Sequence, residues 1–190
     1  FGLRQLFDNA DYRPDMLKLY PCMVMPGTKL FKDWSEGKFK PIQTEEAALL
    51  IAEFKKEIPT YCRVMRVQRD IPTNVTSDGV DKTNLRQYVE KFTKDRGIKC
   101  RCVRCREVGI YERDNKKINI EDIEIVVTEY EASKGVEYFI SAEDVKNDVL
   151  IGFVRLRFPS QFLRSEITET SALIREIHVF GSAVQIGENE

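Results

Sequence analysis

Three cysteines stand within six residues, from Cys100 to Cys105, in the pattern Cys-x-Cys-x-x-Cys. Thiolates are soft ligands, and a structural zinc ion takes four ligands in a tetrahedral arrangement. The run therefore supplies three ligands, Cys100, Cys102 and Cys105, and requires a fourth. The chain has two further cysteines that could provide it, Cys22 and Cys62.

Two other interpretations of the cysteine run stay open at this point. Free cysteines are often small buried hydrophobes, and closely spaced thiols can be redox-active. Plain burial fits poorly, because basic residues flank every cysteine of the run and should reach solvent. Disulfides are not expected, since the chain has five cysteines and a charge-rich composition, which favours a reducing cytoplasm.

The basic residues around the cysteines are candidates for RNA contact. The flanking set is Lys99, Arg101, Arg104 and Arg106, and Lys91, Lys94 and Arg96 extend it upstream. A local patch of this kind can bind phosphates even though the net charge of the whole chain is only −1. The alternative is that these side chains offset the negative charge of zinc-bound thiolates and are otherwise solvated.

Length and composition fit one large domain or two small ones. The chain has 190 residues, of which 42% are hydrophobic and 32% are charged. That balance is typical of a globular protein. No apolar run approaches the ~20 residues of a membrane-spanning helix, so we expect no membrane partner.

The first half of the chain predicts parallel βα units. Strands are expected over residues 16–25 and 61–72. Each is followed by a helix, one opening at Thr44 and one capped by Thr83 or Asn84. In a βα barrel the start of a strand lies at the end to which the preceding helix returns, which is also where the cysteine run would lie. Cys62 stands at a strand start, so we expect it, rather than Cys22, to be the fourth ligand.

The second half predicts an antiparallel sheet. Strand-like stretches cover residues 121–130, 135–141, 149–158 and 173–180, with a turn at Asn147-Asp148. The change from one architecture to the other falls at the cysteine run. The expected class is therefore α/β followed by α+β.

Several phrases along the chain resemble the catalytic subunit of Elongator, a family of enzymes that modify the wobble uridine of tRNA. They are Leu19-Tyr20-Pro21, Arg66-Val67-Gln68-Arg69-Asp70-Ile71-Pro72, Asn84-Leu85-Arg86, Arg104-Cys105-Arg106-Glu107-Val108-Gly109, Asp148-Val149-Leu150-Ile151-Gly152 and Arg175-Glu176-Ile177-His178-Val179-Phe180-Gly181. They occur in order over essentially the whole chain. The cysteine-rich run is similar to that of the archaeal and bacterial single-chain members.

The resemblance implies a fold, a reaction and a set of cofactors. Residues 1–98 would be the C-terminal part of a radical S-adenosylmethionine (SAM) barrel, residues 99–120 a zinc-binding linker, and residues 121–190 the N-terminal part of a GNAT acetyltransferase sheet. The implied enzyme is a tRNA uridine(34) acetyltransferase. It uses acetyl-CoA and SAM radical chemistry, with a 4Fe-4S cluster, to modify C5 of the wobble uridine.

By the same resemblance, Glu176, Ile177, His178 and Val179 would bind acetyl-CoA, and the basic residues Lys99, Arg101, Arg104 and Arg106 would contact tRNA. His178 could also be a general base or simply a structural histidine within the sheet. Likewise, Gln68, Arg69 and Asp70 could face the cofactor or the uridine, or form a salt-bridged barrel rim. The resemblance assigns no catalytic residue.

Two motifs of the family have no match in this sequence. The Cys-x-x-x-Cys-x-x-Cys motif that binds the iron–sulfur cluster differs in spacing from the run at Cys100, and no glycine-rich pyrophosphate loop is present. We therefore expect this chain alone to be inactive. Other functions open to it are a zinc-stabilised RNA-binding module and a protein lysine acetyltransferase. A homodimer and an Elongator-type assembly both remain open.

Overall fold

The computed structural model describes residues 2–181, which form two compact units. Residues 15–102 make one, here called the α/β unit. Of the described residues, 2–14 join 103–181 in the other, here called the sheet unit. Residues 2–14 thus pack with the sheet, whereas the family resemblance assigns residues 1–98 to the barrel.

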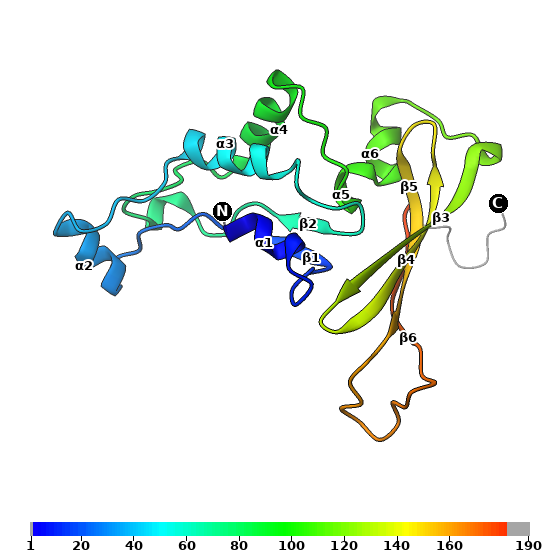
Figure 1. The fold of residues 1–190 in the computed structure, drawn as a ribbon. Helices are drawn as coiled ribbons and strands as arrows, with labels where there is room; N and C mark the ends of the chain where they lie inside the picture. The colour runs from blue at the N-terminus through cyan, green and yellow to red at the C-terminus, as the bar shows by residue number, and fades with distance from the viewer. Residues whose placement is uncertain (1, 182–190) are drawn as a thin grey trace, which may run out of the picture. The chain divides into compact units, whose positions relative to one another are not determined.

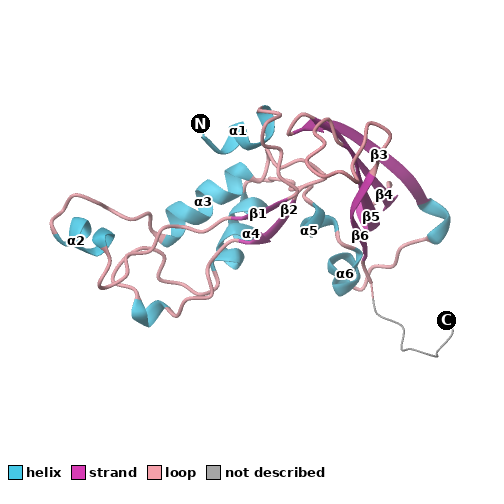
Figure 2. Cartoon of the chain, turned by 90° about the horizontal axis from the view of Figure 1, so that it is seen from below, coloured by secondary structure: helices cyan, strands magenta, loops and turns pink. Residues whose placement is uncertain are grey.

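The α/β unit has two short parallel strands and three helices (Figure 2). Its elements are β1 (Met16–Lys18), α2 (Lys29–Ser35), α3 (Thr44–Phe54), β2 (Arg63–Arg66), a 3-10 turn (Thr73–Val75) and α4 (Leu85–Asp95). Helix α3 buries a face of small and branched residues that includes Ala48 and Ile51, and α4 buries Leu85 and Val89. These apolar faces at helical spacing form the core of the unit.

The parallel pairing of β1 and β2 agrees with the predicted βα order, but both strands are shorter than predicted. The ladder continues only one step beyond Lys18, where the amide of Leu19 donates to the carbonyl of Arg66 at 2.8 Å. Pro21, two residues after Leu19, has no N–H to offer. The continuous apolar run of residues 16–25 is therefore mostly loop, and Met16 is exposed rather than buried.

The predicted helix starts need one correction each. Thr44 is the first residue of α3 and not its N-cap, because its hydroxyl donates to Asp81 Oδ1 at 2.6 Å. At α4 the N-cap is Asn84, but its side chain makes no capping hydrogen bond. Instead, the amide of Leu85 donates to Gln68 Oε1 at 3.2 Å. A side chain distant in sequence thus satisfies the first amide of α4, which local sequence rules cannot foresee.

The sheet unit is built on four antiparallel strands in the order β3-β4-β5-β6, as predicted (Figure 1). The strands are β3 (Ile123–Ala132), β4 (Gly135–Asp144), β5 (Val149–Phe158) and β6 (Leu173–Val179). The helices are α1 (Gly2–Asp8), α5 (Val103–Arg106) and α6 (Val108–Tyr111), with 3-10 turns at Glu112–Asp114 and Ile120–Asp122. The predicted turn at Asn147-Asp148 is present, with Asp148 at a φ of 59°.

The two faces of this sheet differ in chemistry. One face is apolar and exposed along its outer strands, as at Val127, Ile177 and Val179. The other face buries Phe139 and Phe153 together with charged residues such as Arg155. Alternation along the strands produces this division, because successive side chains point to opposite faces.

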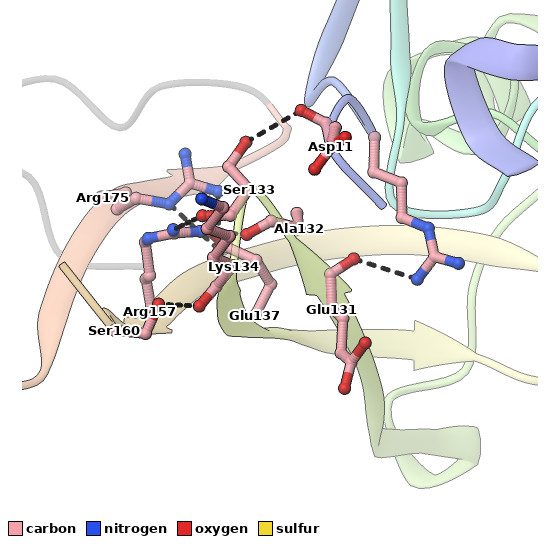
Figure 3. Close-up of polar contacts among 10 residues, drawn as sticks. Asp11, Glu131, Ala132, Ser133, Lys134, Glu137, Arg157, Ser160 and Arg175 are labelled. Atoms are coloured by element: carbon pink, nitrogen blue, oxygen red, sulfur yellow. Dashed lines mark hydrogen bonds and ion pairs between the residues drawn. The ribbon is translucent and has the colours of Figure 1, made fainter. Parts of the chain in front are cut away.

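The tight turn between β3 and β4 is held by side chains from three other segments (Figure 3). Four consecutive carbonyls, those of residues 131–134, each accept a side-chain hydrogen bond: Glu131 from Arg13, Ala132 and Ser133 from Arg157, and Lys134 from Ser160. In the reverse direction, Ser133 donates through its amide to Ala10 and through its hydroxyl to Asp11. The loop that follows α1 is thereby fastened to the turn.

Among the helices that the structure describes, none is long and apolar enough to cross a membrane.

Candidate metal centre and ligand-binding strand

The three cysteines of the run converge on one point. The Sγ atoms of Cys100, Cys102 and Cys105 all lie within 4.8 Å of one another. Gly97, at a φ of 62°, ends the preceding helix, and Cys102 directly precedes the short helix α5, which contains Cys105. Cys102 is buried and the other two are half-buried. Three thiols in this arrangement can bind a metal ion.

The two candidates for a fourth ligand differ in their surroundings. Cys62 is fully buried and directly precedes β2, as predicted, whereas Cys22 is exposed. Neither belongs to the group whose ligand atoms lie within 4.8 Å of one another. The assignment of Cys62 therefore stays a prediction.

The basic residues near the cysteines fall into two kinds. Lys99 and Arg101 are exposed, and Arg104 is half-buried, with its guanidinium 3.7 Å from Glu107. Arg106 is different: it is buried, and its Nη1 donates to Glu143 Oε2 at 2.6 Å and lies 3.7 Å from Asp148. A buried, paired guanidinium is not available to a phosphate, so we remove Arg106 from the predicted RNA-contact set.

Strand β6 bears the four residues predicted to bind acetyl-CoA. It lies at the end of the strand order in the described part of the sheet, so one of its edges is open there. Glu176, which is half-buried, and His178, which is exposed, lie on the face that contains Phe153, and the His178 ring stacks on the Phe153 ring at a centroid distance of 5.8 Å. Ile177 and Val179 point to the other face and are 72% and 77% exposed.

The side chains at the predicted barrel rim bind the protein itself. Gln68 Nε2 donates to the carbonyl of Lys82 at 2.6 Å, in addition to accepting from Leu85. Asp70 pairs with Arg66, and Arg69 lies over the Tyr20 ring with its Cζ 5.5 Å from the centroid. These contacts favour the salt-bridged rim over a cofactor role for Gln68.

Comparison with known proteins covers both units. Residues 14–95 match the family described as Radical_SAM C-terminal domain. The chain is 48% identical over 179 residues to a tRNA uridine(34) acetyltransferase of Methanocaldococcus infernus, covering 94% of this chain and 34% of that protein. It is 41% identical over 187 residues to human Elongator complex protein 3, covering 98% and 34%. The resemblance to the catalytic subunit of Elongator is confirmed.

The chain also matches a solved structure of a relative in three dimensions. The archaeal Elp3 of Methanocaldococcus infernus with an N-terminal deletion superimposes with a TM-score of 0.91 at 47% identity. The match covers 94% of this chain and 42% of that chain. The chain thus spans about a third of the length of the curated Elongator relatives that it matches.

Sequence reasoning missed the charged residues that surround β6. Arg155 and Arg157 stand two apart on β5, so they share a face, and they pair with Glu176 and Glu137 respectively. The signal was present as two arginines alternating with Val154, Leu156 and Phe158 in an otherwise apolar strand. Charges at inward-facing positions of a strand require partners.

Proposed function

We propose that this chain is part of a tRNA uridine(34) acetyltransferase of the Elongator type, which uses acetyl-CoA and SAM radical chemistry to modify C5 of the wobble uridine. One observation supports this proposal above all others. The 48% identity to an archaeal enzyme of that name runs over 94% of the chain and so includes both units. A protein related only through one unit would not show this.

Each part of the chain then has a role in the proposal. The α/β unit contributes the C-terminal part of the radical SAM region, in line with the family match over residues 14–95. Residues 99–120 would be a zinc linker, and residues 121–190 the first part of a GNAT acetyltransferase domain. The apolar face of the sheet at Val127, Ile177 and Val179 is exposed in this chain. In a complete layered domain, such a face is covered by another layer. The exposed face therefore supports the proposal that residues 121–190 are only the first part of a domain.

The proposed zinc ion fits the donor set of the cysteine run. Zinc prefers thiolates at about 2.3 Å, and three sulfurs within 4.8 Å of one another need to move little to share one ion. The ion would hold the linker in shape, because metal binding and folding are coupled. SAM and the 4Fe-4S cluster would be bound by the full-length protein, and we assign neither to these cysteines.

Exposed cations support the proposed contact with tRNA. Lys99 and Arg101 are open to solvent, and Arg104 is partly so. Cations of this kind track phosphates through sequence-independent attraction. Assembly into an Elongator-type complex is consistent with the names of the relatives, and we propose a cytoplasmic location for an enzyme that acts on tRNA.

Mass spectrometry of tRNA tests the proposal. Full-length protein, with reconstituted cluster, is incubated with unmodified tRNA, SAM, a reductant and acetyl-CoA labelled with carbon-13 in the acetyl group. We expect the label in a modified uridine at position 34. Unlabelled tRNA together with labelled lysines in an added protein substrate would favour the protein acetyltransferase instead, and tRNA binding without either product would favour the RNA-binding module.

A further inference from the structure

Strand β6 contains a register shift next to the predicted acetyl-CoA residues. Across β5 and β6, Arg155 lies opposite Glu176, but the next residue, Leu156, lies opposite Ile174. The pairing therefore skips Arg175, which is the pattern of a β-bulge. Bulges turn the local backbone and re-aim side chains, and they are frequent beside binding sites.

Arg175, the residue that the pairing skips, is bound by a buried carboxylate on another strand of the same sheet (Figure 3). Arg175 Nε and Nη2 donate to Glu137 Oε2 at 3.0 and 2.7 Å. The second oxygen of Glu137 accepts from Arg157 Nη1 at 2.6 Å. Glu137 is 2% exposed, so one buried carboxylate on β4 binds guanidinium groups from both β5 and β6.

Glu176, the residue that follows the bulge, is also bound by a buried charged side chain, that of Arg155. Arg155 Nε donates to Glu176 Oε2 at 2.8 Å. The Arg155 guanidinium lies against two aromatic rings that pack on each other, with its Cζ 5.0 Å from the centroid of Phe139 and 4.9 Å from that of Phe153. A guanidinium stacked on rings is fixed in direction, and it fixes the carboxylate that it binds.

Stability alone does not account for these charges. Burying an ion pair costs desolvation that its attraction roughly offsets, and apolar residues of similar volume often serve as well. What the pairs do provide is geometry, because Arg155 and Glu176 link β5 to β6, and Glu137 and Arg175 link β4 to β6 across β5, each at defined residues. Both act at the bulge, on an edge strand whose outward backbone groups can pair with an extended ligand.

We propose that Glu137 and Arg155 are positioning residues that fix the bulge of β6, so that the backbone of residues 176–179 can hold the amide groups of the pantetheine arm of acetyl-CoA. This inference rests on the proposed function. Neither side chain needs to touch the ligand. Loss of either one would let β6 slip or fray and would misplace the backbone groups.

The test replaces Glu137 with Gln, which keeps its size and removes its charge. The matched control is Glu143→Gln on the same strand, since Glu143 is also buried and pairs with an arginine, Arg106, away from β6. Both variants are made in the full-length protein. Isothermal titration calorimetry measures acetyl-CoA affinity, and hydrogen exchange without ligand measures the protection of residues 173–179.

We expect Glu137→Gln to weaken acetyl-CoA binding at least tenfold and to speed exchange in residues 173–179, while Glu143→Gln leaves both near wild type at a similar loss of melting temperature. Wild-type affinity and protection in Glu137→Gln would overturn the inference and leave the proposed function intact. Wild-type protein that binds no acetyl-CoA would instead remove the acetyl-CoA role itself, and with it the proposed function.

A second variant covers the case in which Glu137→Gln does not fold. Arg175 is partly exposed, so Arg175→Gln removes one arm of the pair at less cost to the core. The same loss of affinity and protection is expected, to a smaller degree. Equal values in Arg175→Gln and wild type would also count against the inference.

Discussion

The Arg106 guanidinium lies 2.6 Å from one carboxylate and 3.7 Å from another, in a stretch where Lys99 and Arg101 are exposed. Removing one member of a buried ion pair leaves the other charge without compensation and costs about 3–5 kcal/mol. We therefore expect Arg106→Gln to lower the free energy of unfolding by about that amount. Urea denaturation followed by circular dichroism measures the change, and a loss below about 1 kcal/mol would contradict the buried pairing.

The exposed neighbours should behave in the opposite way. Arg101→Gln is expected to leave the unfolding free energy nearly unchanged and to weaken tRNA binding. Each lost phosphate contact reduces the slope of log affinity against log salt by about 1. Binding of tRNA measured across a salt series checks this, with Lys38→Gln in the same unit but far along the chain as a control for loss of one exposed charge. An unchanged slope in Arg101→Gln would limit that arginine to offsetting the thiolate charge.

Asp144 gives the sheet unit a predictable response to acid. The Asn147 side chain donates to Asp144 Oδ2 at 2.8 Å, and this bond, with that from the Asn147 amide, holds the Asp144 pKa below its ordinary value. A lowered pKa means that the ionised carboxylate stabilises the fold above about pH 4, and that this stabilisation is lost as pH falls through the folded-state pKa. Asp144→Asn should therefore be less stable than wild type at pH 7, and the difference should shrink in acid. A constant difference between pH 7 and pH 3 would refute this role.

At the scale of elements, the cysteine run depends on the end of α4 and on the single turn of α5. We expect full-length protein to contain one zinc ion per chain at this site, with Cys62 as the fourth ligand. Cys62→Ser should then lose metal and melt at a lower temperature, and Cys22→Ser should keep its metal. Elemental analysis decides between them, since metal loss only in Cys22→Ser would assign the fourth position to that residue.

The loop after α1 is coupled to the β3–β4 turn through Arg13, whose Nη1 donates to the carbonyl of Glu131 at 2.9 Å. Replacing Arg13 with Ala should remove about 1 kcal/mol of local stability and speed amide exchange in residues 131–134. Lys134→Ala is the matched control, because the turn uses the carbonyl of Lys134 and not its ammonium group. Equal exchange in the two variants would show that Arg13 does not hold the turn.

Regular alternation explains why the sheet could be predicted, whereas in the α/β unit the strands and their parallel order were predicted but their lengths were not. In β5, side chains alternate between the two faces, so strand type and antiparallel pairing followed from local pattern. The run from Met16 to Met25 has no such period, and its short strand depends on the position of β2. Partners of buried charges depend on register: Arg155 lies opposite Glu176, and the pairing then skips Arg175, which binds Glu137 instead. No local rule places that shift.

For the whole molecule, the proposed function couples two reactions, release of the acetyl group from acetyl-CoA and the SAM radical reaction on the wobble uridine. We expect the full-length protein to consume acetyl-CoA only when tRNA is bound, because hydrolysis without an acceptor would waste the acetyl group. Release of free CoA, measured with and without tRNA, checks this. Equal rates in the two conditions would remove tRNA control while leaving acetyl-CoA binding in place.

The sheet unit is discontinuous in sequence, and this affects how it is made on the ribosome. Residues 1–14 leave the exit tunnel well before the turn at residues 131–134 to which they bind. Residues 15–102 lie between them and can complete their own contacts during that interval, since domains generally fold as units during synthesis. Arg13 must then find the turn across an already folded insertion, which is a slow, non-local closure. Among residues 2–181, the contact between Arg13 and the β3–β4 turn therefore forms only after the α/β unit has been synthesised.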